Sequence, residues 1–244
     1  MRIAIISDIH SNLEALLATK CELEHLDVDR IICLGDVVGY GASPEACCAL
    51  IRNMTEITLL GNHDAAVSRR MDYGAYYEAA RQVLDWTAAQ LSSPNLAWLR
   101  SLPYAYRFGD LCFSHGAPLR PEAYEYIFTI EQLEELLPHY EALSEVTFIG
   151  HSHMSKAFAL SEGGEFFEAR DPIVSIQPGR KYVISVGSIG QPRDYDNRSC
   201  FVVYDTAKRI AQFHRVEYDI ETSARRIFEA DLALNFGKRL FLGI

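Results

Sequence analysis

A chain of 244 residues, of which 49% are hydrophobic, is long enough for one large domain with a substantial apolar core. The formal net charge of -10 disfavours a large non-specific nucleic-acid surface. No apolar run approaches the roughly 20 residues that a membrane helix needs, so we expect a cytoplasmic protein with no membrane span. The six cysteines contain no C-x-x-C pair, which indicates reduced thiols of the core.

The N-terminal quarter alternates between short apolar runs and amphipathic segments. Helices are predicted to begin after the N-cap Asn12 and at Pro44. The apolar runs predict strands, at residues 3–7, 31–34 and 55–60. This β-α-β-α-β order favours parallel strands with helices packed on the sheet.

The middle of the chain begins with a helical stretch. Residues 73–101 have an apolar stripe, and Pro94 begins a second short helix, so we expect a candidate helical lid over a cleft. Gly109-Asp110 predicts a hairpin turn, followed by a short acidic helix at 131–137 and a strand at 146–149.

Beyond residue 153 the pattern becomes strand-like with turn residues between the strands. Antiparallel pairing is expected, and hence a second sheet made by this part of the chain and packed on the first. The predicted strands lie at residues 158–160, 166–169, 182–186, 201–204 and 210–218. Asp219 is expected to cap a final helix over 219–235, and no linker divides residues 1–244, so we predict a single domain.

Side chains that bind divalent cations follow most of the apolar runs. Carboxylates, an amide and imidazoles at strand ends are typical of a metal site, because the ends of neighbouring strands gather at one edge of an α/β sheet. The motifs are Asp8-Ile9-His10, Gly35-Asp36, Gly61-Asn62-His63-Asp64, His115-Gly116 and Gly150-His151-Ser152-His153.

In this order the motifs resemble the calcineurin-like metallophosphoesterase superfamily, whose pattern is D-x-H, G-D, G-N-H-D/E, H and G-H-x-H. The resemblance spans about Ile3 to Ser188. The segment Gly187–Arg193 is also similar to small bacterial and archaeal phosphodiesterase-like members. The resemblance implies an α/β fold of two packed mixed β-sheets flanked by helices, a four-layer α-β-β-α sandwich.

The resemblance also implies a role for each donor. One metal would be held by Asp8, His10 and His153, the other would be held by Asn62, His115 and His151, and Asp36 would bridge the two. Imidazole and carboxylate ligands suit Mn, Fe, Zn or Ni, and Mg is also acceptable. Two such cations would outweigh the nearby carboxylates and allow an acidic protein to bind phosphate.

The expected activity is hydrolysis of a phosphoester bond in a phosphodiester, phosphomonoester or nucleotide, by in-line attack of a metal-bridging hydroxide. His63 is expected to protonate the leaving group, with Asp64 orienting or charge-stabilising its ring. Arg193 is the candidate substrate-binding residue, and an ion pair with Asp194 or Asp196 is the alternative. Several tyrosines could stack on a base or belong to the core, namely Tyr40, Tyr73, Tyr76, Tyr124 and Tyr195.

Other functions stay open at this stage. A dinucleoside polyphosphate hydrolase would use the same metals, and a non-enzymatic interaction scaffold could share the fold. A recombination-repair nuclease is disfavoured by the short, acidic chain. The expected partner is a small phosphorylated substrate, and the apolar ending 240–244 is compatible with a homo-oligomer.

Overall fold

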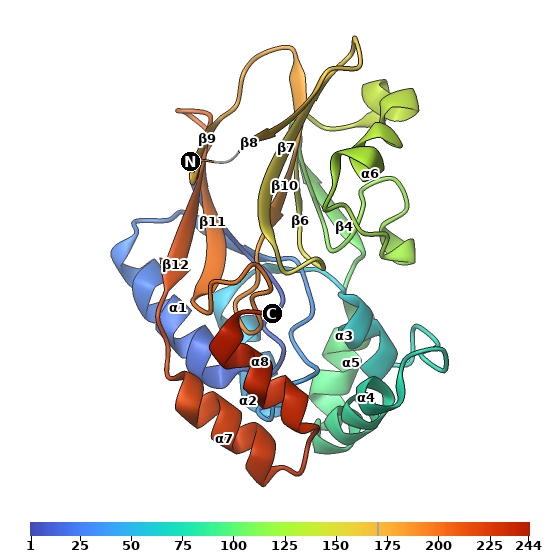
Figure 1. The fold of residues 1–244 in the computed structure, drawn as a ribbon, viewed down its shortest axis with the longest axis vertical. Helices are drawn as coiled ribbons and strands as arrows, with labels where there is room; N and C mark the ends of the chain where they lie inside the picture. The colour runs from blue at the N-terminus through green and yellow to red at the C-terminus, as the bar shows by residue number, and fades with distance from the viewer. Residues whose placement is uncertain (170) are drawn as a thin grey trace.

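Two six-stranded β-sheets pack against each other in the computed structural model, which describes residues 1–169 and 171–244 (Figure 1). The first sheet has the order β3-β2-β1-β11-β12-β9. Its strands are β1 (Arg2–Ile6), β2 (Arg30–Cys33), β3 (Ile57–Thr58), β9 (Ile173–Ser175), β11 (Ser199–Asp205) and β12 (Ile210–Val216).

The second sheet has the order β4-β5-β6-β10-β7-β8. Its strands are β4 (Ala105–Phe108), β5 (Leu111–Ser114), β6 (Val146–Ile149), β7 (Ser155–Ser161), β8 (Phe166–Ala169) and β10 (Arg180–Val186). Each sheet contains three adjacent parallel strands, which are β1, β2 and β3 in the first sheet and β5, β6 and β10 in the second.

Helices cover the outer faces of the sheets, so the predicted four-layer α-β-β-α fold is confirmed. Figure 1 shows α1 beside the first sheet and α6 beside the second, with the other helices gathered at one end of the molecule. The α-helices are α1 (Leu13–His25), α2 (Pro44–Met54), α3 (Asn62–Val67), α4 (Glu78–Gln90), α5 (Ser93–Ser101), α6 (Ile130–Glu134), α7 (Ile220–Glu229) and α8 (Leu234–Leu242). Two 3-10 helices lie at Pro121–Ala123 and Leu137–Ala142.

The last four residues of strand β1, Ile3–Ile6, are all apolar because both faces of the strand are buried. Ile3 and Ile5 pack between the two sheets, whereas Ala4 and Ile6 pack under the helices on the outer face. A strand buried on both faces has no polar alternation, because neither face meets water. Phe113 and Phe148 of the second sheet fill the space between the sheets, with ring centroids 5.5 Å apart.

The predicted sheet of C-terminal strands is wrong, because these strands divide between the two sheets. Strand β11 pairs with β1 and extends the first sheet, whereas β10 pairs with β6 and extends the second. The short edge strand β9 was not predicted. A period-two pattern identifies a strand but not its partner strand, because any neighbouring strand can satisfy its backbone hydrogen bonds.

The C-terminal helix predicted over 219–235 is two helices. Asp219 caps α7 as expected, and its carboxylate accepts a hydrogen bond from the Thr222 N–H at 2.9 Å. The chain then turns at Asp231, whose φ of 54° is left-handed, before α8 begins. Among the described residues, no helix is long and apolar enough to cross a bilayer.

Candidate metal centre

The carboxyl ends of the parallel strands from both sheets meet at one place. Asp8 and His10 follow β1, Asp36 follows β2, and Asn62 follows the short strand β3. From the second sheet, His115 follows β5, and His151 and His153 follow β6. The structure therefore brings six of the seven predicted donors into groups that could hold a metal, Asn62 lines the same cleft, and all seven are buried.

Two groups of donors share this centre. In the first group, the Oδ1 atom of Asp8 lies 3.3 Å from Nε2 of His153 and 3.7 Å from Nε2 of His10. In the second group, the Oδ2 atom of Asp36 lies 3.3 Å from Nε2 of His115, and His151 completes a set whose ligand atoms lie within 4.8 Å of one another. Asp36 also lies 3.6 Å from His10, so its carboxylate stands between the groups.

Backbone carbonyls fix the orientation of three of the imidazoles. A carbonyl oxygen can only accept, so each of these rings donates from Nδ1 and directs Nε2 at the centre, where it offers a lone pair when the ring is neutral. The contacts are His10 Nδ1 to Val38 O at 3.1 Å, His115 Nδ1 to Leu34 O at 3.1 Å and His153 Nδ1 to Gln191 O at 2.6 Å.

The donor atoms suit a cation because they lack other partners. Nε2 of His10 and Nε2 of His153 face each other at 3.0 Å, so two lone pairs meet when both rings are neutral. Among the described residues, buried Oδ1 of Asp8, Oδ1 of Asn62 and Nε2 of His115 have no hydrogen-bond partner. Unsatisfied buried polar atoms are destabilising, and divalent cations bound at the two groups would satisfy them.

The electrostatics of the centre also favour cations. Burial lowers the pKa of His10 and His153 well below the usual value, which keeps both rings neutral. Burial raises the pKa of Asp8 to about 6. Burial would also raise the pKa of Asp36, but His115 and His63 outweigh it and hold that pKa well below its usual range.

His115 and Asp36 each favour the charged form of the other. Burial disfavours its charged form, yet Asp36 and Asp8 raise the pKa of His115 to about 9. In the absence of a cation the ring therefore carries a proton near the carboxylates. Metal ligands must be deprotonated, so a cation binding here would displace that proton.

The backbone around the donors is unusual. Five of them have a left-handed conformation that non-glycine residues rarely adopt, namely Asp8 (φ 55°), His10 (φ 49°), Asp36 (φ 51°), His151 (φ 65°) and His153 (φ 60°). Asp8 and His10 lie in a turn beyond the end of β1, so the alternation of a β-strand does not set the direction of their side chains. Gly61 is required because a Cβ there would collide with the Asp36 carboxylate.

His63 lies beside the donors, but Asp64 does not orient its ring. The Asp64 carboxylate accepts hydrogen bonds from the backbone N–H groups of Val37, Val38 and Gly61 at 3.1–3.2 Å. The buried Nδ1 of His63 has no hydrogen-bond partner among the described residues. The predicted Asp64–His63 contact is therefore absent, and Asp64 instead joins the loop after β2 to the start of α3.

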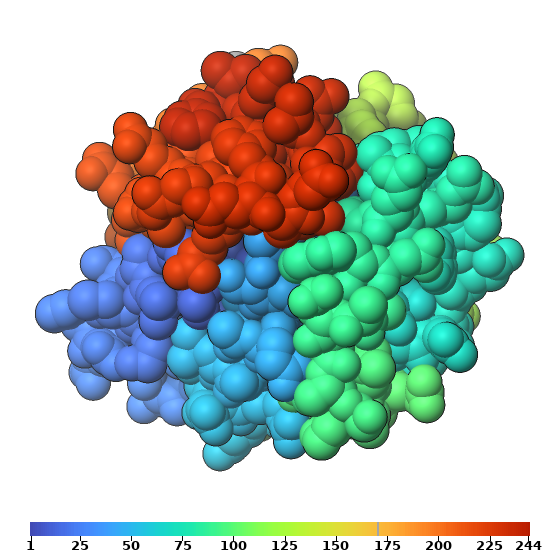
Figure 2. Space-filling model, turned by 90° about the horizontal axis from the view of Figure 1, so that it is seen from below, coloured from blue at the N-terminus to red at the C-terminus, as the bar shows by residue number. Residues whose placement is uncertain are grey.

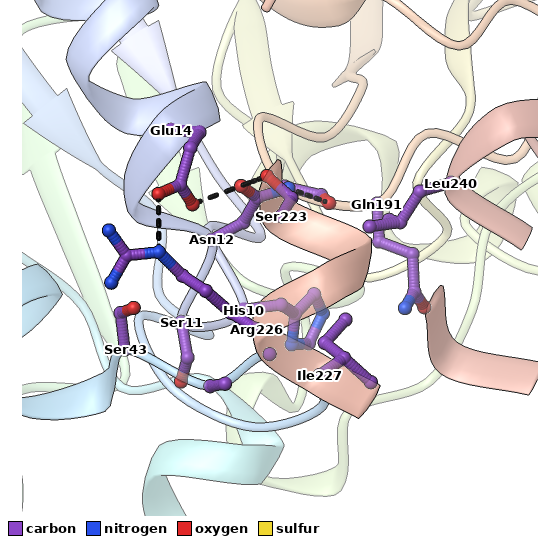
Figure 3. Close-up of a pocket in the computed structure, with 13 residues that line it drawn as sticks. His10, Ser11, Asn12, Glu14, Ser43, Gln191, Ser223, Arg226, Ile227 and Leu240 are labelled. Carbon is purple, nitrogen blue, oxygen red and sulfur yellow. Dashed lines mark hydrogen bonds and ion pairs between the residues drawn. The ribbon is translucent and has the colours of Figure 1, made fainter. Parts of the chain in front are cut away.

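A network on the far side of His10 holds its loop in place (Figure 3). Asn12 caps α1 by accepting from the Ala15 N–H at 3.2 Å, and its Nδ2 donates to Gly190 O at 2.9 Å. Ser223 of α7 donates to Oδ1 of Asn12 at 2.8 Å. Asn12 is therefore a helix cap that ties two loops of the centre to the C-terminal helices.

Aromatic residues line the cleft above the donors, which encloses about 490 Å³. Of the predicted tyrosines, Tyr40, Tyr76 and Tyr124 line it. Two do not, because Tyr73 hydrogen-bonds to Asp85 and the Tyr195 side chain is 86% exposed.

Two further cleft tyrosines, Tyr77 and Tyr126, were missed. Tyr126 stacks on His151 at a centroid distance of 3.9 Å. Their only signal in the sequence was an aromatic residue near a donor motif.

The predicted lid contributes only its first part. From the predicted lid, Ala75, Tyr76, Tyr77 and Ala80 line the cleft next to Met71, which precedes the lid, whereas α5 packs against α2 and α3. The side-chain amide of Asn62 donates to the Tyr76 hydroxyl at 2.9 Å, so this segment touches a donor directly.

The comparisons with known proteins agree with this geometry. The model of the calcineurin-like phosphoesterase superfamily domain matches residues 1–209. An uncharacterized protein of Methanocaldococcus jannaschii is 36% identical over 247 residues, covering 99% of this chain and 98% of that protein. The crystal structure of a metallophosphoesterase from Sphaerobacter thermophilus is 34% identical with a TM-score of 0.86, covering 100% of this chain and 99% of the other.

A hypothetical protein from Pyrococcus horikoshii shares the fold, with a TM-score of 0.79 at 20% identity, covering 100% of this chain and 98% of the other. The family match, these relatives and the converging donors lead to one conclusion. The chain belongs to the calcineurin-like phosphoesterase superfamily and is a phosphoesterase.

Proposed function

We propose that the seven donors hold two divalent cations and that the protein hydrolyses a phosphoester bond of a small phosphorylated substrate. Asp8, His10 and His153 would hold one cation, and Asn62, His115 and His151 the other, with Asp36 between them. Cations bound there would supply Lewis acidity toward phosphoryl oxygens and a nucleophile from water near neutral pH. Manganese, iron, zinc and nickel suit these ligands, and magnesium is also acceptable.

One observation carries this proposal. Three donor atoms are buried without a hydrogen-bond partner, and two imidazole lone pairs face each other across 3.0 Å. A buried structural network would pair these atoms with one another. The separate groups Asp8–His10–His153 and Asp36–His115–His151, which approach each other where His10 lies 3.6 Å from Asp36, support a pair of cations instead.

The residues of the chain have separate tasks. Carbonyl-anchored imidazoles keep their lone pairs on the centre without reorganisation. The cleft is large enough for a ligand of the size of a nucleotide. Arg193 lines the cleft, where its guanidinium can contact phosphate oxygens.

His63 is our candidate for proton delivery to the leaving oxygen. Its ring lines the cleft next to Asp36 but has no partner for Nδ1 among the described residues. Asp64 holds the loop around His63 by accepting hydrogen bonds from backbone N–H groups, and it does not take part in the proposed proton transfer.

The test combines metal analysis with a substrate panel. Wild-type protein loaded with manganese should retain about two ions per chain and hydrolyse at least one of p-nitrophenyl phosphate, its bis-ester, a cyclic nucleotide and diadenosine tetraphosphate. His63→Ala should keep its metal and lose turnover by about a hundredfold or more, which is the usual contribution of a positioned proton donor. His139→Ala, a change of an exposed histidine that lies outside every motif, is the matched control.

Failure to bind any divalent cation would refute the proposed centre. Full metal content without activity on any phosphoester would instead revive the interaction-scaffold alternative. Unchanged turnover in His63→Ala would remove only the role of His63.

A further inference from the structure

Two arginines from distant parts of the chain converge on one oxygen atom. Arg193, in the loop after β10, donates from Nη2 to Oε1 of Gln191 at 2.7 Å. Arg239, in α8, donates from Nη1 to the same Oε1 at 3.2 Å. The shared acceptor brings the two guanidinium groups close together. Figure 3 shows Gln191 beside Leu240, the neighbour of Arg239 on α8.

No carboxylate neutralises this pair among the described residues. The candidate partners predicted for Arg193 are engaged elsewhere, since Asp194 bonds to Arg215 and Asp196 to Arg198. The Nε atom of Arg193 is buried and has no acceptor. Two adjacent guanidinium groups around a neutral amide repel each other, so the arrangement calls for an anion.

The pair is tied directly to the proposed metal centre. Arg193 lines the same cleft as Asp36 and His153, and its backbone N–H donates to the carbonyl oxygen of His153 at 3.2 Å. The Arg193 guanidinium lies over the Tyr40 ring at 5.6 Å, and Tyr40 in turn packs against His10 at a centroid distance of 4.7 Å. An anion on the arginines would therefore sit beside a phosphoryl group at the donors.

Arg239 comes from a segment that the family match does not cover. The match ends at residue 209, whereas α8 spans Leu234–Leu242 and packs on α7. Figure 2 shows the C-terminal helices in red meeting the segment in green that contains the predicted lid. Burial and the neighbouring Arg193 lower the pKa of Arg239, which is the expected consequence of a cation held without a counter-ion.

We propose that Arg193 and Arg239 bind a second phosphoryl group of the substrate. The substrate class is then a compound with two or more closely spaced phosphates, such as a nucleoside diphosphate or a longer phosphoanhydride. This inference rests on the proposed function for the placement of the first phosphoryl group. The C-terminal helix α8 thereby becomes part of the substrate site.

The test measures binding with a matched pair of probes that hydrolysis cannot consume. Calorimetry compares methylenediphosphonate, which carries two anionic groups, with methylphosphonate, which carries one, on manganese-loaded protein. Wild type should bind the diphosphonate more tightly. Arg239→Gln should weaken that binding by about tenfold, the typical effect of a lost charged hydrogen bond, and should change methylphosphonate binding little.

Lys238→Gln removes the same charge from the adjacent, exposed position of α8 and should behave as wild type. Arg239→Lys keeps the charge but loses the planar fork, so an intermediate affinity is expected. It also provides a folded comparison if Arg239→Gln proves unstable in a thermal melt. Manganese content is measured after each titration, so that metal extraction by the diphosphonate is seen in all variants alike.

Equal diphosphonate binding by Arg239→Gln and Lys238→Gln would overturn the inference. An equal loss for both probes would also overturn it, because it would indicate a site for an independent anion such as free phosphate. If the wild type hydrolyses the panel substrates but Arg239→Gln binds diphosphonate normally, only this inference fails. If no phosphoester is cleaved but the diphosphonate effect is present, the proposed function fails and the anion site stands.

Discussion

The floor and the rim of the cleft are built by opposite means. The floor, which consists of the seven donors, is buried and held by backbone groups at the ends of paired strands. The rim consists of Tyr76, Tyr77, Tyr126 and Arg193, with Arg239 sharing the acceptor Gln191 with Arg193, and it comes from loops and helices at the surface. The side chain of Tyr77 is 57% exposed and that of Tyr126 is 45% exposed.

This difference suggests that the floor carries out the reaction and that the rim selects the substrate. A donor in the floor cannot move without breaking strand-end hydrogen bonds or leaving its left-handed backbone conformation. A rim residue can be exchanged with little effect on the sheets, because loops tolerate change more readily than the core. We expect changes in the floor to abolish activity and changes in the rim to alter substrate preference.

The strongest test of the floor is Asp36→Asn. The amide keeps the shape of the side chain, and its oxygen can still accept a hydrogen bond from the backbone N–H of His63, but the charge between the two donor groups is lost. Because supporting residues alone contribute 10–100-fold to metal sites, turnover should fall by more than about a hundredfold, with loss of bound metal. Metal analysis and hydrolysis of the bis-ester measure the effect, and Asp27→Asn at an exposed site is the control. Retention of both metals by Asp36→Asn would contradict the proposal that the floor residues hold the metals.

Metal removal should destabilise the protein through the floor. Binding at roughly 100 times the dissociation constant stabilises a fold by about 2.7 kcal/mol, which corresponds to a melting shift of about 5–10 °C for a chain of this size. A thermal melt after chelation and dialysis should show that decrease, and added manganese should reverse it. The same melting temperature with and without metal would contradict the centre.

Tyr76→Phe tests the point where rim and floor touch. The change removes the acceptor of the Asn62 side-chain amide and leaves the ring in place. Metal affinity should fall by about tenfold, as expected for a residue that supports a ligand. Tyr77→Phe, one position further along the chain, lacks this contact and should bind metal as the wild type does. A competition titration with a fluorescent chelator distinguishes the two variants.

The smallest effect is expected at Asp196, in the loop that follows Arg193. Hydrogen bonds from Arg198 lower the pKa of Asp196 to about 2. A carboxylate with a depressed pKa stabilises the fold above its unfolded value of about 3.9, and that contribution is lost as the pH falls through 2. Urea midpoints for wild type and Asp196→Asn should therefore differ slightly at pH 5 and converge toward pH 2. A constant difference would show that ionisation is not involved.

Much of the first sheet and its helices could be predicted because their signals are local. Asn12 caps α1 and Pro44 begins α2 as expected. In the second sheet, the equally local signal Gly109-Asp110 forms the predicted hairpin between β4 and β5. The partners of β10 and β11 could not be predicted, because strand pairing depends on chain segments far apart in sequence.

The same division holds for the centre. The sequence by itself determined which residues are the candidate donors and their order, because few side chain types bind divalent cations and most of the motifs follow an apolar strand. Only the tertiary structure decided their directions, since left-handed turns and carbonyl contacts aim the rings rather than strand alternation. The tertiary structure also decided that Asp64 accepts hydrogen bonds from backbone N–H groups, and that Arg239 of α8 shares the acceptor Gln191 with Arg193. These contacts join residues many positions apart, and no local pattern encodes the distance between them.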